Sequence, residues 1–245
     1  GGDFGIVARD RGVGALSITV TDVTGGRAIS AVNDGGGRLA VTATGTVTGT
    51  DNEGIYARDT GGGDLYLRVA TVQGATQGIA AINDGAGDLT VLASGLVSGT
   101  SASGLVAQDN TGGSVRIEVA AVTGGAAGIV AINEAEGNLT VTTSGAVIGL
   151  NGSGLRAVSG AYSGDIALNL GGVTRGTTEG VYVNGGFASG GLGITLGSAA
   201  AAVGGSVGVF AQHLGTGAVL LDNAGTIQQS SGAVALQAVD ITSFH

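Results

Sequence analysis

The fold is decided by residues 78–91, which read GIAAINDGAGDLTV. Fifty residues later, residues 128–141 read GIVAINEAEGNLTV, and fifty residues earlier, residues 28–41 read AISAVNDGGGRLAV. Between these stretches the chain carries shorter versions of the same motif, Gly-(Ile/Leu/Val)-x-Ala. The motif therefore recurs about every 25 residues, and a fixed period in this range is the signature of a solenoid.

Ten copies of the motif follow one another at spacings of 23 to 28 residues; they begin at Gly5, Ala28, Gly54, Gly78, Gly104, Gly128, Gly154, Gly180, Gly208 and Ala233. After each motif come a turn rich in Asp, Asn and Gly, a segment of strictly alternating apolar residues, and a third short apolar segment. Alternation places every second residue on one face of a strand. We predict an all-β fold, a single-stranded right-handed parallel β-helix (β-solenoid) of about ten coils with three short strands each.

Stacking the coils predicts three interior columns. The first is aliphatic and runs through Ile6, Ile29, Ile55, Ile79, Leu105, Ile129, Leu155, Val181, Val209 and Val234. The second is small and runs through Ala8, Ala31, Ala57, Ala81, Ala107, Ala131, Ala157, Val183, Ala211 and Leu236. The third runs through Val23, Val47, Val72, Val97, Val122, Val147, Val173 and Ile227. A large column beside a small one fills a narrow interior. Glycine at the corners is expected to supply positive φ and close backbone approach.

The corner after each Ala has a longer period of two coils. Odd coils place Asp10, Asp59 and Asp109 there, and even coils place Asn33, Asn83 and Asn133. The unit is therefore better described as about 50 residues long. The same alignment predicts that Arg38 lies beside Asp64 in the next coil.

Composition excludes several classes of protein. The 245 residues include 52 Gly and 18 acidic residues against nine basic ones, with a net charge of −9. Nucleic acid is an unsuitable partner because phosphate binding needs clustered positive charge. Absence of Cys excludes disulfides, thiolate metal sites and thiol nucleophiles. Absence of Pro suits a chain made of ladder-forming strands. The chain has no unbroken apolar run of about 18–20 residues, so we expect no membrane insertion of this segment.

The domain organisation follows from the regularity of the coils. Residues 1–245 are expected to form one solenoid domain, with regular coils over 5–179, an irregular coil over 180–207 and last coils over 208–245. The chain starts without Met and its last residues stop in mid-coil. We therefore expect a fragment of a longer chain, with any signal peptide outside it.

Carboxylates offer two candidate sites. Asp34, Asp84 and Glu134 stack at intervals of two coils, about 9–10 Å apart by the strand spacing. That separation is wide for a retaining glycosidase pair and near the upper end for an inverting one. Residues of this type after a strand are typical turn formers, which is the interpretation we favour. Arg116 and Glu118 point outward from one strand, with Arg68 in the equivalent place two coils earlier; a solvated face is favoured over a site.

Other catalytic and binding motifs are weak. His213 and His245 are too few for a zinc site, and His213 falls in the corner column of Asp59 and Asn83, as a stacked turn residue. The Thr-x-Thr alternation over 42–50, of the kind that orders ice, does not persist two coils on. We therefore assign no catalytic residue, no cofactor-binding residue and no metal ligand, and we expect no cofactor.

The doublets in 78–97 and 128–147 resemble the repeats of autotransporter passenger domains and of related bacterial surface adhesins. The resemblance covers residues 5–170 well and the remainder loosely. It implies a rod-like passenger exported through the outer membrane to the cell surface, with a membrane barrel elsewhere in the chain.

We interpret the chain as a non-catalytic structural or adhesive module of the cell surface. Its side faces, or the irregular part around Gly185–Gly193, would meet a glycan, a protein or copies of itself. One exposed column is unusually apolar: Tyr56, Val106, Val130, Tyr182 and Phe210. A lateral contact surface is one interpretation of it, and scattered surface apolar residues, which are common, are the interpretation we favour. Two alternatives stay open: a polysaccharide-degrading β-helix enzyme, and the protomer of an end-to-end filament.

Overall fold

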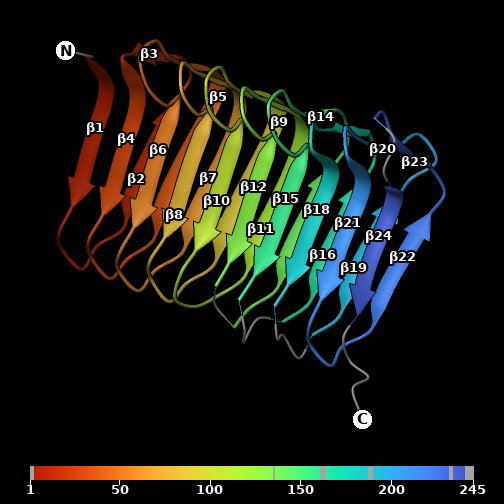
Figure 1. Cartoon of the computed structure of the whole chain (residues 1–245). Helices are drawn as coiled ribbons and strands as arrows, with labels where there is room; N and C mark the ends of the chain where they lie inside the picture. The colour runs from red at the N-terminus through yellow and green to blue at the C-terminus, as the bar shows by residue number, and fades with distance from the viewer. Residues whose placement is uncertain (1–2, 135, 161–163, 187–189, 232–233, 241–245) are drawn as a thin grey trace.

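The structure is a computed structural model that describes residues 3–134, 136–160, 164–186, 190–231 and 234–240. All 24 elements of the described residues are β-strands, and they stack in parallel as a β-solenoid of about nine turns. Figure 1 shows the coils succeeding one another from the N-terminal end to the C-terminal end of the rod. The fold class predicted from the repeat is confirmed.

One side of the rod is a ten-stranded sheet built from the Gly-(Ile/Leu/Val)-x-Ala motifs. Its strands follow one another in chain order: β1 (Phe4–Asp10), β4 (Arg27–Asn33), β6 (Ile55–Asp59), β8 (Ile79–Asn83), β10 (Leu105–Asp109), β12 (Ile129–Asn133), β15 (Leu155–Ser159), β18 (Glu179–Gly185), β21 (Val207–His213) and β24 (Val234–Asp240).

The second sheet holds the alternating segments and the third short segments. Its main path is β2 (Leu16–Val20), β5 (Leu39–Gly49), β7 (Leu65–Gly74), β9 (Leu89–Gly99), β11 (Val115–Gly124), β13 (Leu139–Thr143), β16 (Ile166–Leu170), β19 (Leu192–Leu196) and β22 (Val219–Asn223). The shorter strands beside this path are β3 (Val23–Gly25), β14 (Val147–Gly149), β17 (Val173–Arg175), β20 (Ala201–Gly204) and β23 (Thr226–Gln229). In β5, β7, β9 and β11 the second and third segments form one strand, and its register shifts midway. An irregularity of this kind bends a strand locally, and we call this place the bend.

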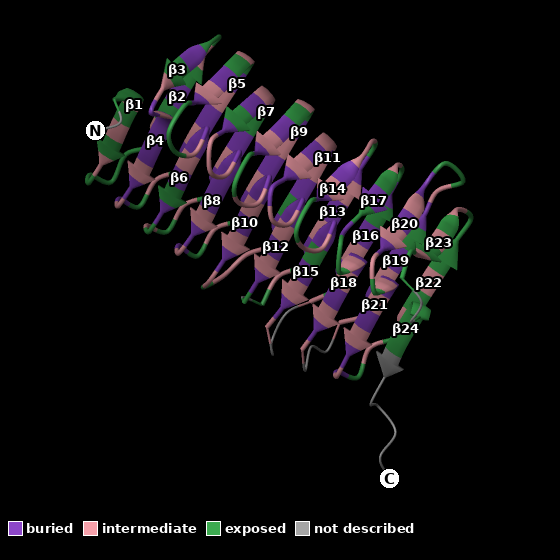
Figure 2. Ribbon diagram, turned by 45° about the horizontal axis from the view of Figure 1, so that its top comes forward, coloured by how far each residue is buried: buried purple, intermediate pink, exposed green. Residues whose placement is uncertain are grey.

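The core is a single cluster that runs the length of the rod. Figure 2 shows buried residues alternating with less buried ones along the strands, and exposed residues on β24. The first two predicted columns are confirmed from the first coil to β21, because the inter-strand register pairs each member with the next. From Ile29 to Val209 the aliphatic column is fully buried.

Three column assignments were wrong, two in the last coil and one in the third column. In the last coil Leu236, not Val234, pairs with Val209, and Ala238, not Leu236, pairs with Ala211. The motif of the last coil is therefore shifted by two residues. A shift of two preserves the alternation of inward and outward residues, so the sequence pattern does not reveal it. In the third column the inward residue after Val147 is Thr174, with no exposed surface, whereas Val173 is 39% exposed. The register with the neighbouring coils decides which residue is buried here. As a result, the polar Thr174 is inside and the apolar Val173 is outside.

The corner glycines serve close approach and not left-handed backbone. Among the described residues Gly113 is the glycine with positive φ, at 96°. A side chain on Gly61 would instead overlap the carbonyl oxygen of Gly35 in the preceding coil. The expectation of close backbone approach is confirmed, and the expectation of widespread positive φ was wrong. Stacked coils need contact between corner backbones more than they need a reversed turn.

Ala81→Leu is expected to destabilise the fold by about 1–3 kcal/mol, because it inserts three carbon atoms into a filled interior. Ala81 is fully buried and stacks between Ala57 and Ala107. The matched control is Ala40→Leu, on the outer face between Ser17 and Tyr66, where the same enlargement meets solvent. Urea denaturation followed by circular dichroism gives both values; equal effects of the two substitutions would show that Ala81 is not an interior position.

Candidate functional site

The stacked acids at the corners are held by side chains of neighbouring coils. Arg9 donates to Asp34, with Nε 2.7 Å from Oδ2, and Arg58 donates to Asp84 at the same distance. Glu134, the third member of the row, is exposed at its corner. The interpretation of these acids as turn residues agrees with this geometry, since two of the three carboxylates take part in inter-coil contacts.

Further hydrogen bonds connect these carboxylates to polar side chains. Thr60 donates its hydroxyl to Asp34 Oδ1 over 3.1 Å, and Asn110 donates its amide to Asp84 Oδ1 over 2.6 Å. The hydrogen bond from Arg9 is the main reason that the pKa of Asp34 is lowered. Burial raises the pKa of Asp84, but the bonds from Asn110 and Arg58 outweigh burial and lower the pKa overall. Both groups are therefore ionised near neutral pH and suited to structural pairing, not to general acid catalysis.

The two-coil period corresponds to a buried ladder of alternating Asn and Asp. Asn33, Asp59, Asn83, Asp109 and Asn133 have no exposed surface. Asn33 donates to Asp59 Oδ2 in the next coil over 3.3 Å, and Asn83 donates to Asp109 Oδ2 over the same distance. Oδ1 of each of these four residues accepts a backbone N–H of its own turn, beside the amide nitrogen that donates in Asn and the second carboxylate oxygen that accepts in Asp. Alternation keeps a donor beside each buried carboxylate and keeps two carboxylates from stacking directly.

Burial of these carboxyls changes their titration. Desolvation raises the pKa of Asp59, although its hydrogen bonds act in the opposite direction. The same cause raises the pKa of Asp109 to about 6. A buried carboxyl with a raised pKa can mark a catalytic acid. Here each carboxylate is enclosed by its own turn and by an Asn of the preceding coil, so the ladder holds the corner together.

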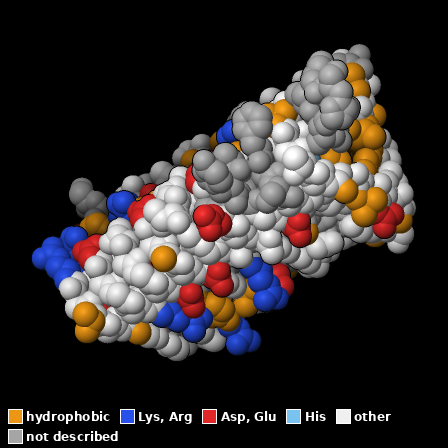
Figure 3. Space-filling view, turned by 90° about the horizontal axis from the view of Figure 1, so that it is seen from below, with side chains coloured by type: hydrophobic (Ala, Val, Ile, Leu, Met, Phe, Trp, Pro, Cys, Tyr) orange, Lys and Arg blue, Asp and Glu red, His pale blue; other side chains and the backbone are white. Residues whose placement is uncertain are grey.

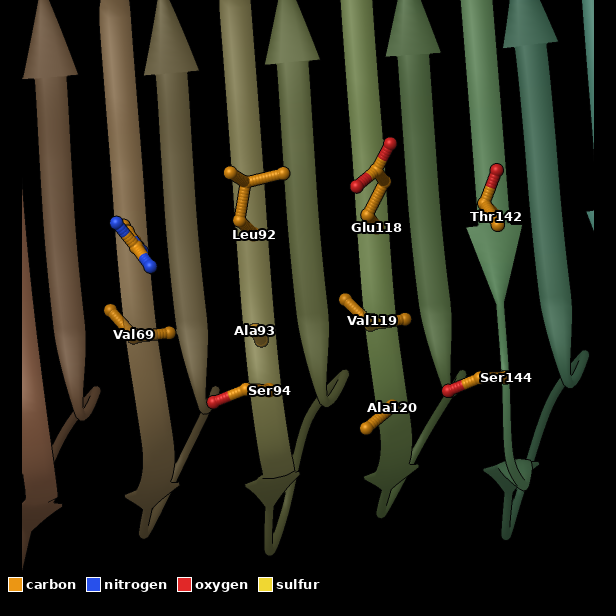
Figure 4. A pocket seen from close by; sticks show the side chains of 10 residues that line it. Val69, Leu92, Ala93, Ser94, Glu118, Val119, Ala120, Thr142 and Ser144 are labelled. Carbon is orange, nitrogen blue, oxygen red and sulfur yellow. The ribbon is translucent and has the colours of Figure 1, made fainter.

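The candidate site on the outer face of the second sheet is a groove. Arg116 and Glu118 lie two residues apart on β11 and form an ion pair and hydrogen bonds with each other. Arg68 aligns with Leu92, and Leu92 aligns with Glu118, so Arg68 lies two coils from Glu118 in the same row. Figure 4 shows Leu92, Glu118 and Thr142 in this row on adjacent strands. Arg68 and Glu118 line one hollow of about 430 Å³.

Cations and aromatic rings stack on the outer side of the ten-stranded sheet. The rings of Tyr182 and Phe210 are parallel with centroids 5.1 Å apart, and the guanidinium of Arg156 lies 5.5 Å from the Tyr182 centroid. Near the other end, Arg27 lies 4.9 Å from the Tyr56 centroid and pairs with Glu53. The aromatic members of the predicted apolar column are thus covered in part by neighbours along the rod.

The predicted contact of Arg38 with Asp64 is not formed by the side chains. Backbone register does place these residues in adjacent coils, since Leu39 N–H donates to the Asp64 carbonyl. The Arg38 guanidinium lies over the ring of Tyr66, 4.4 Å from its centroid. A flat guanidinium stacks well on an aromatic face, and such a contact competes with an exposed ion pair of small free energy.

His213 lies in the predicted corner column, where it follows Ser159 and Gly185 and is 1% exposed. A side chain on Gly185 would approach its ring to 2.9 Å, so the glycine provides the space that the imidazole occupies. Neither ring nitrogen has a hydrogen-bond partner in the described part of the chain. His245 lies outside the described residues, as do residues 187–189 of the irregular Gly185–Gly193 segment.

His213→Leu is expected to leave the free energy of unfolding within about 1 kcal/mol of wild type, or to raise it, because the change removes unpartnered buried nitrogens. The control is Asn33→Leu in the same column, whose amide makes three hydrogen bonds. That change is expected to cost at least about 2 kcal/mol, since a backbone carbonyl, a backbone N–H and a buried carboxylate lose their partner. If the two substitutions cost the same in urea titrations, the imidazole has an essential interaction.

The described residues contain no group of three or more His, Cys, Asp or Glu side chains placed to hold a metal ion. They also contain no helix that is long and apolar enough to cross a membrane. Figure 3 shows acidic side chains spaced along this side of the rod with basic groups near some of them, and wide areas of backbone and small polar side chains between.

No protein-family model matches the chain, and neither does any curated protein or solved structure. The stacked parallel strands place the protein in the structural class of parallel β-solenoids.

Sequence reasoning missed two features. The groove depends on the midway bend of the long strands, which changes which outer side chains face one another. A signal was present in the Gly45 and Gly95 positions inside otherwise alternating segments, since glycine in a strand marks an irregularity. The hydrogen bonds of the Asn–Asp ladder could have been inferred from the two-coil period, because carboxylates stacked in consecutive coils would repel.

Proposed function

We propose that the chain is a non-catalytic, rod-shaped module that serves as a structural and adhesive stalk on a bacterial cell surface. Its repeats resemble those of autotransporter passenger domains, which supports export through the outer membrane. Absence of Cys and Pro and an excess of acidic residues agree with such a chain. The partners would be a glycan or protein on a neighbouring surface, or copies of the same rod.

The observation that carries this proposal is where the polar side chains are used. Inside the rod and at its corners they connect one coil to the next, as Asn33 does with Asp59 and Arg58 with Asp84. These side chains stabilise the stacking of the coils. Because they are engaged in hydrogen bonds between coils, we assign them no role in bond cleavage. On the flat sides they are open to solvent, as Arg68 and Ser94 are. A rod with this arrangement presents sites laterally and keeps its shape.

Adhesion in flow tests the proposal. The purified chain is attached to a glass channel by one terminus, and retention of bacterial and mammalian cells is compared with a channel that carries the heat-denatured chain. We expect retention that depends on the native fold and is competed by the soluble chain. Equal retention on both channels would contradict an adhesive role.

Two parallel measurements separate the alternatives. Release of reducing or unsaturated sugars from a panel of polysaccharides would make the chain an enzyme and overturn the non-catalytic assignment. Electron micrographs that show long fibres of the purified chain would instead favour a filament protomer. The proposed module is expected to give neither sugar release nor fibres.

A further inference from the structure

The outer side of the second sheet carries a continuous groove where the long strands bend. Two hollows of about 430 Å³ and 320 Å³ share Arg68, Val69 and Ser94, so they form one channel across β5, β7, β9, β11 and β13. Each strand contributes one outward residue before the bend and another near or after it. Figure 4 shows these as two rows, with Leu92, Glu118 and Thr142 in one and Ser94, Ala120 and Ser144 in the other.

The dimensions of the groove select a linear ligand. Five adjacent coils at the strand spacing span about 19 Å, measured along the rod and across the strands. The backbone groups of these strands are used in pairing with the coils on either side. A peptide cannot add to the sheet here as a further strand, because that mode needs a free sheet edge. Recognition must therefore come from side chains along the groove.

The charge of the groove differs from the charge of the whole chain. Glu118 is neutralised by Arg116 on the same strand. Arg68 is exposed, and within the described part of the chain neither a carboxylate nor an aromatic ring lies against its guanidinium, in contrast to Arg58 and Arg38. The groove thus holds one uncompensated cation on a protein of net charge −9. A guanidinium is a planar, bidentate donor suited to carboxylate or sulfate groups.

Hydroxyl groups complete the lining: Thr42, Thr44, Ser94, Thr142 and Ser144. In one row Thr44, Ser94 and Ser144 recur in every second coil. A hydroxyl both donates and accepts, so this spacing matches a ligand that presents hydroxyls at regular intervals. The floor between them is formed by Val69, Ala93 and Val119, whose side chains are almost fully buried. Such a floor is smooth and offers no deep pocket for a large apolar side chain.

We propose that this groove binds a strand of an acidic polysaccharide, with Arg68 holding its carboxylate or sulfate group and the Thr and Ser hydroxyls of the groove holding its ring hydroxyls. The proposal deepens the adhesive function and rests on it. A polyanionic peptide has the same charge but lacks the hydroxyls, and a neutral polysaccharide has the hydroxyls but lacks the charge. These two ligands therefore separate the contributions of Arg68 and of the hydroxyl side chains.

Isothermal titration of the whole chain tests the proposal with four oligomers of matched length: a polyuronate, a sulfated glycan, a neutral glycan and polyglutamate. We expect the polyuronate or the sulfated glycan to bind at least tenfold more tightly than the neutral glycan and polyglutamate. The tighter of the two acidic glycans identifies the anionic group. Raising the salt concentration is expected to weaken this binding, because an exposed charge contact is screened.

Substitutions locate the site. Arg68→Gln and Ser94→Trp are expected to weaken binding of the acidic glycan about tenfold, the first by removing the cation and the second by filling the groove. Their controls are Arg38→Gln, whose guanidinium lies over Tyr66, and Ser98→Trp, on the same strand beyond the bend. The controls are expected to bind as wild type does, and circular dichroism checks that all four variants fold.

Three results would overturn the proposal: no acidic glycan binds, polyglutamate binds as tightly as the glycans, or Arg68→Gln binds like wild type. If an Arg68→Gln chain still retains cells in the flow channel, the adhesive function is upheld but is carried by another face of the rod. Loss of retention in all chains, with glycan binding intact, would instead contradict the adhesive function alone.

Discussion

Gly61→Ala is expected to destabilise the protein by at least about 3 kcal/mol, one of the largest effects available to a single methyl group. A Cβ at this position would overlap the carbonyl oxygen of Gly35, which belongs to the backbone of the preceding coil. Neither side can yield by rotating a side chain, so two coils must move apart and weaken the inter-coil hydrogen bonds around the corner. Urea denaturation followed by circular dichroism measures the loss.

The adjacent residue provides a matched control. Among the described residues, apart from its two chain neighbours, no heavy atom lies within 4 Å of a Cβ built on Gly62, and the φ of Gly62 is not in the left-handed region. Gly62→Ala is therefore expected to be neutral or to stabilise by about 0.4–1 kcal/mol, because alanine restricts the unfolded chain. A cost for Gly62→Ala as large as that for Gly61→Ala would mean that the corner needs glycine for its backbone conformation and not for close approach.

The stability of the wild-type protein is expected to increase by about 1–2 kcal/mol between pH 8 and pH 5. Burial raises the pKa of Asp109 to about 6 and also raises the pKa of Asp59. A carboxyl with a raised folded-state pKa binds its proton more tightly in the folded protein than in the unfolded chain. Lowering the pH through about 6 therefore favours the folded state, and urea midpoints across this range measure the gain.

The gain ends at lower pH. The pKa values of Asp34 and Asp84 are lowered in the folded protein, so their pairing stabilises the fold above the unfolded pKa of about 4 and is lost below it. Stability is therefore expected to pass through a maximum between about pH 4 and about pH 5. The control is Asp109→Asn, in which the gain between pH 8 and pH 5 becomes smaller. An unchanged gain in this variant, or a wild-type stability that falls over the same interval, would contradict the assignment.

The parts of the fold that repeat could be predicted from the sequence. Ile79 and Ala81 recur with equivalents in other coils, so their burial follows from the period alone, and the structure confirms it. The wrong column assignments lie at places where the pattern of a single coil had to be interpreted without support from its neighbours. Leu236 lies near the end of the described coils, where the interior residues are 42% exposed and the alternation fits two registers equally well.

Contacts between coils were harder to predict than columns. The place of His213 in the corner column followed from alignment, but the space that it fills depends on Gly185 in the preceding coil. The groove at Arg68 depends on the bend of four long strands, and spacing along the sequence does not encode the angle of a bend. Alignment gives the neighbour of each residue, whereas the direction of its side chain depends on packing, as Arg38 and Tyr66 illustrate.

The alternation of Asn and Asp along the buried ladder has a consequence for how such a rod can change its length. Duplication or deletion of one coil within 28–133 would bring two carboxylates, or two amides, into consecutive coils. Duplication or deletion of two coils leaves every junction of Asn with Asp as it was. Lengths that differ by about 50 residues are therefore compatible with the ladder, whereas a one-coil change that removes an Asn coil or repeats an Asp coil places two buried carboxylates in repulsive contact. The ladder therefore favours the gain or loss of coils in pairs. A gene segment that encodes two coils is the natural unit by which this rod lengthens.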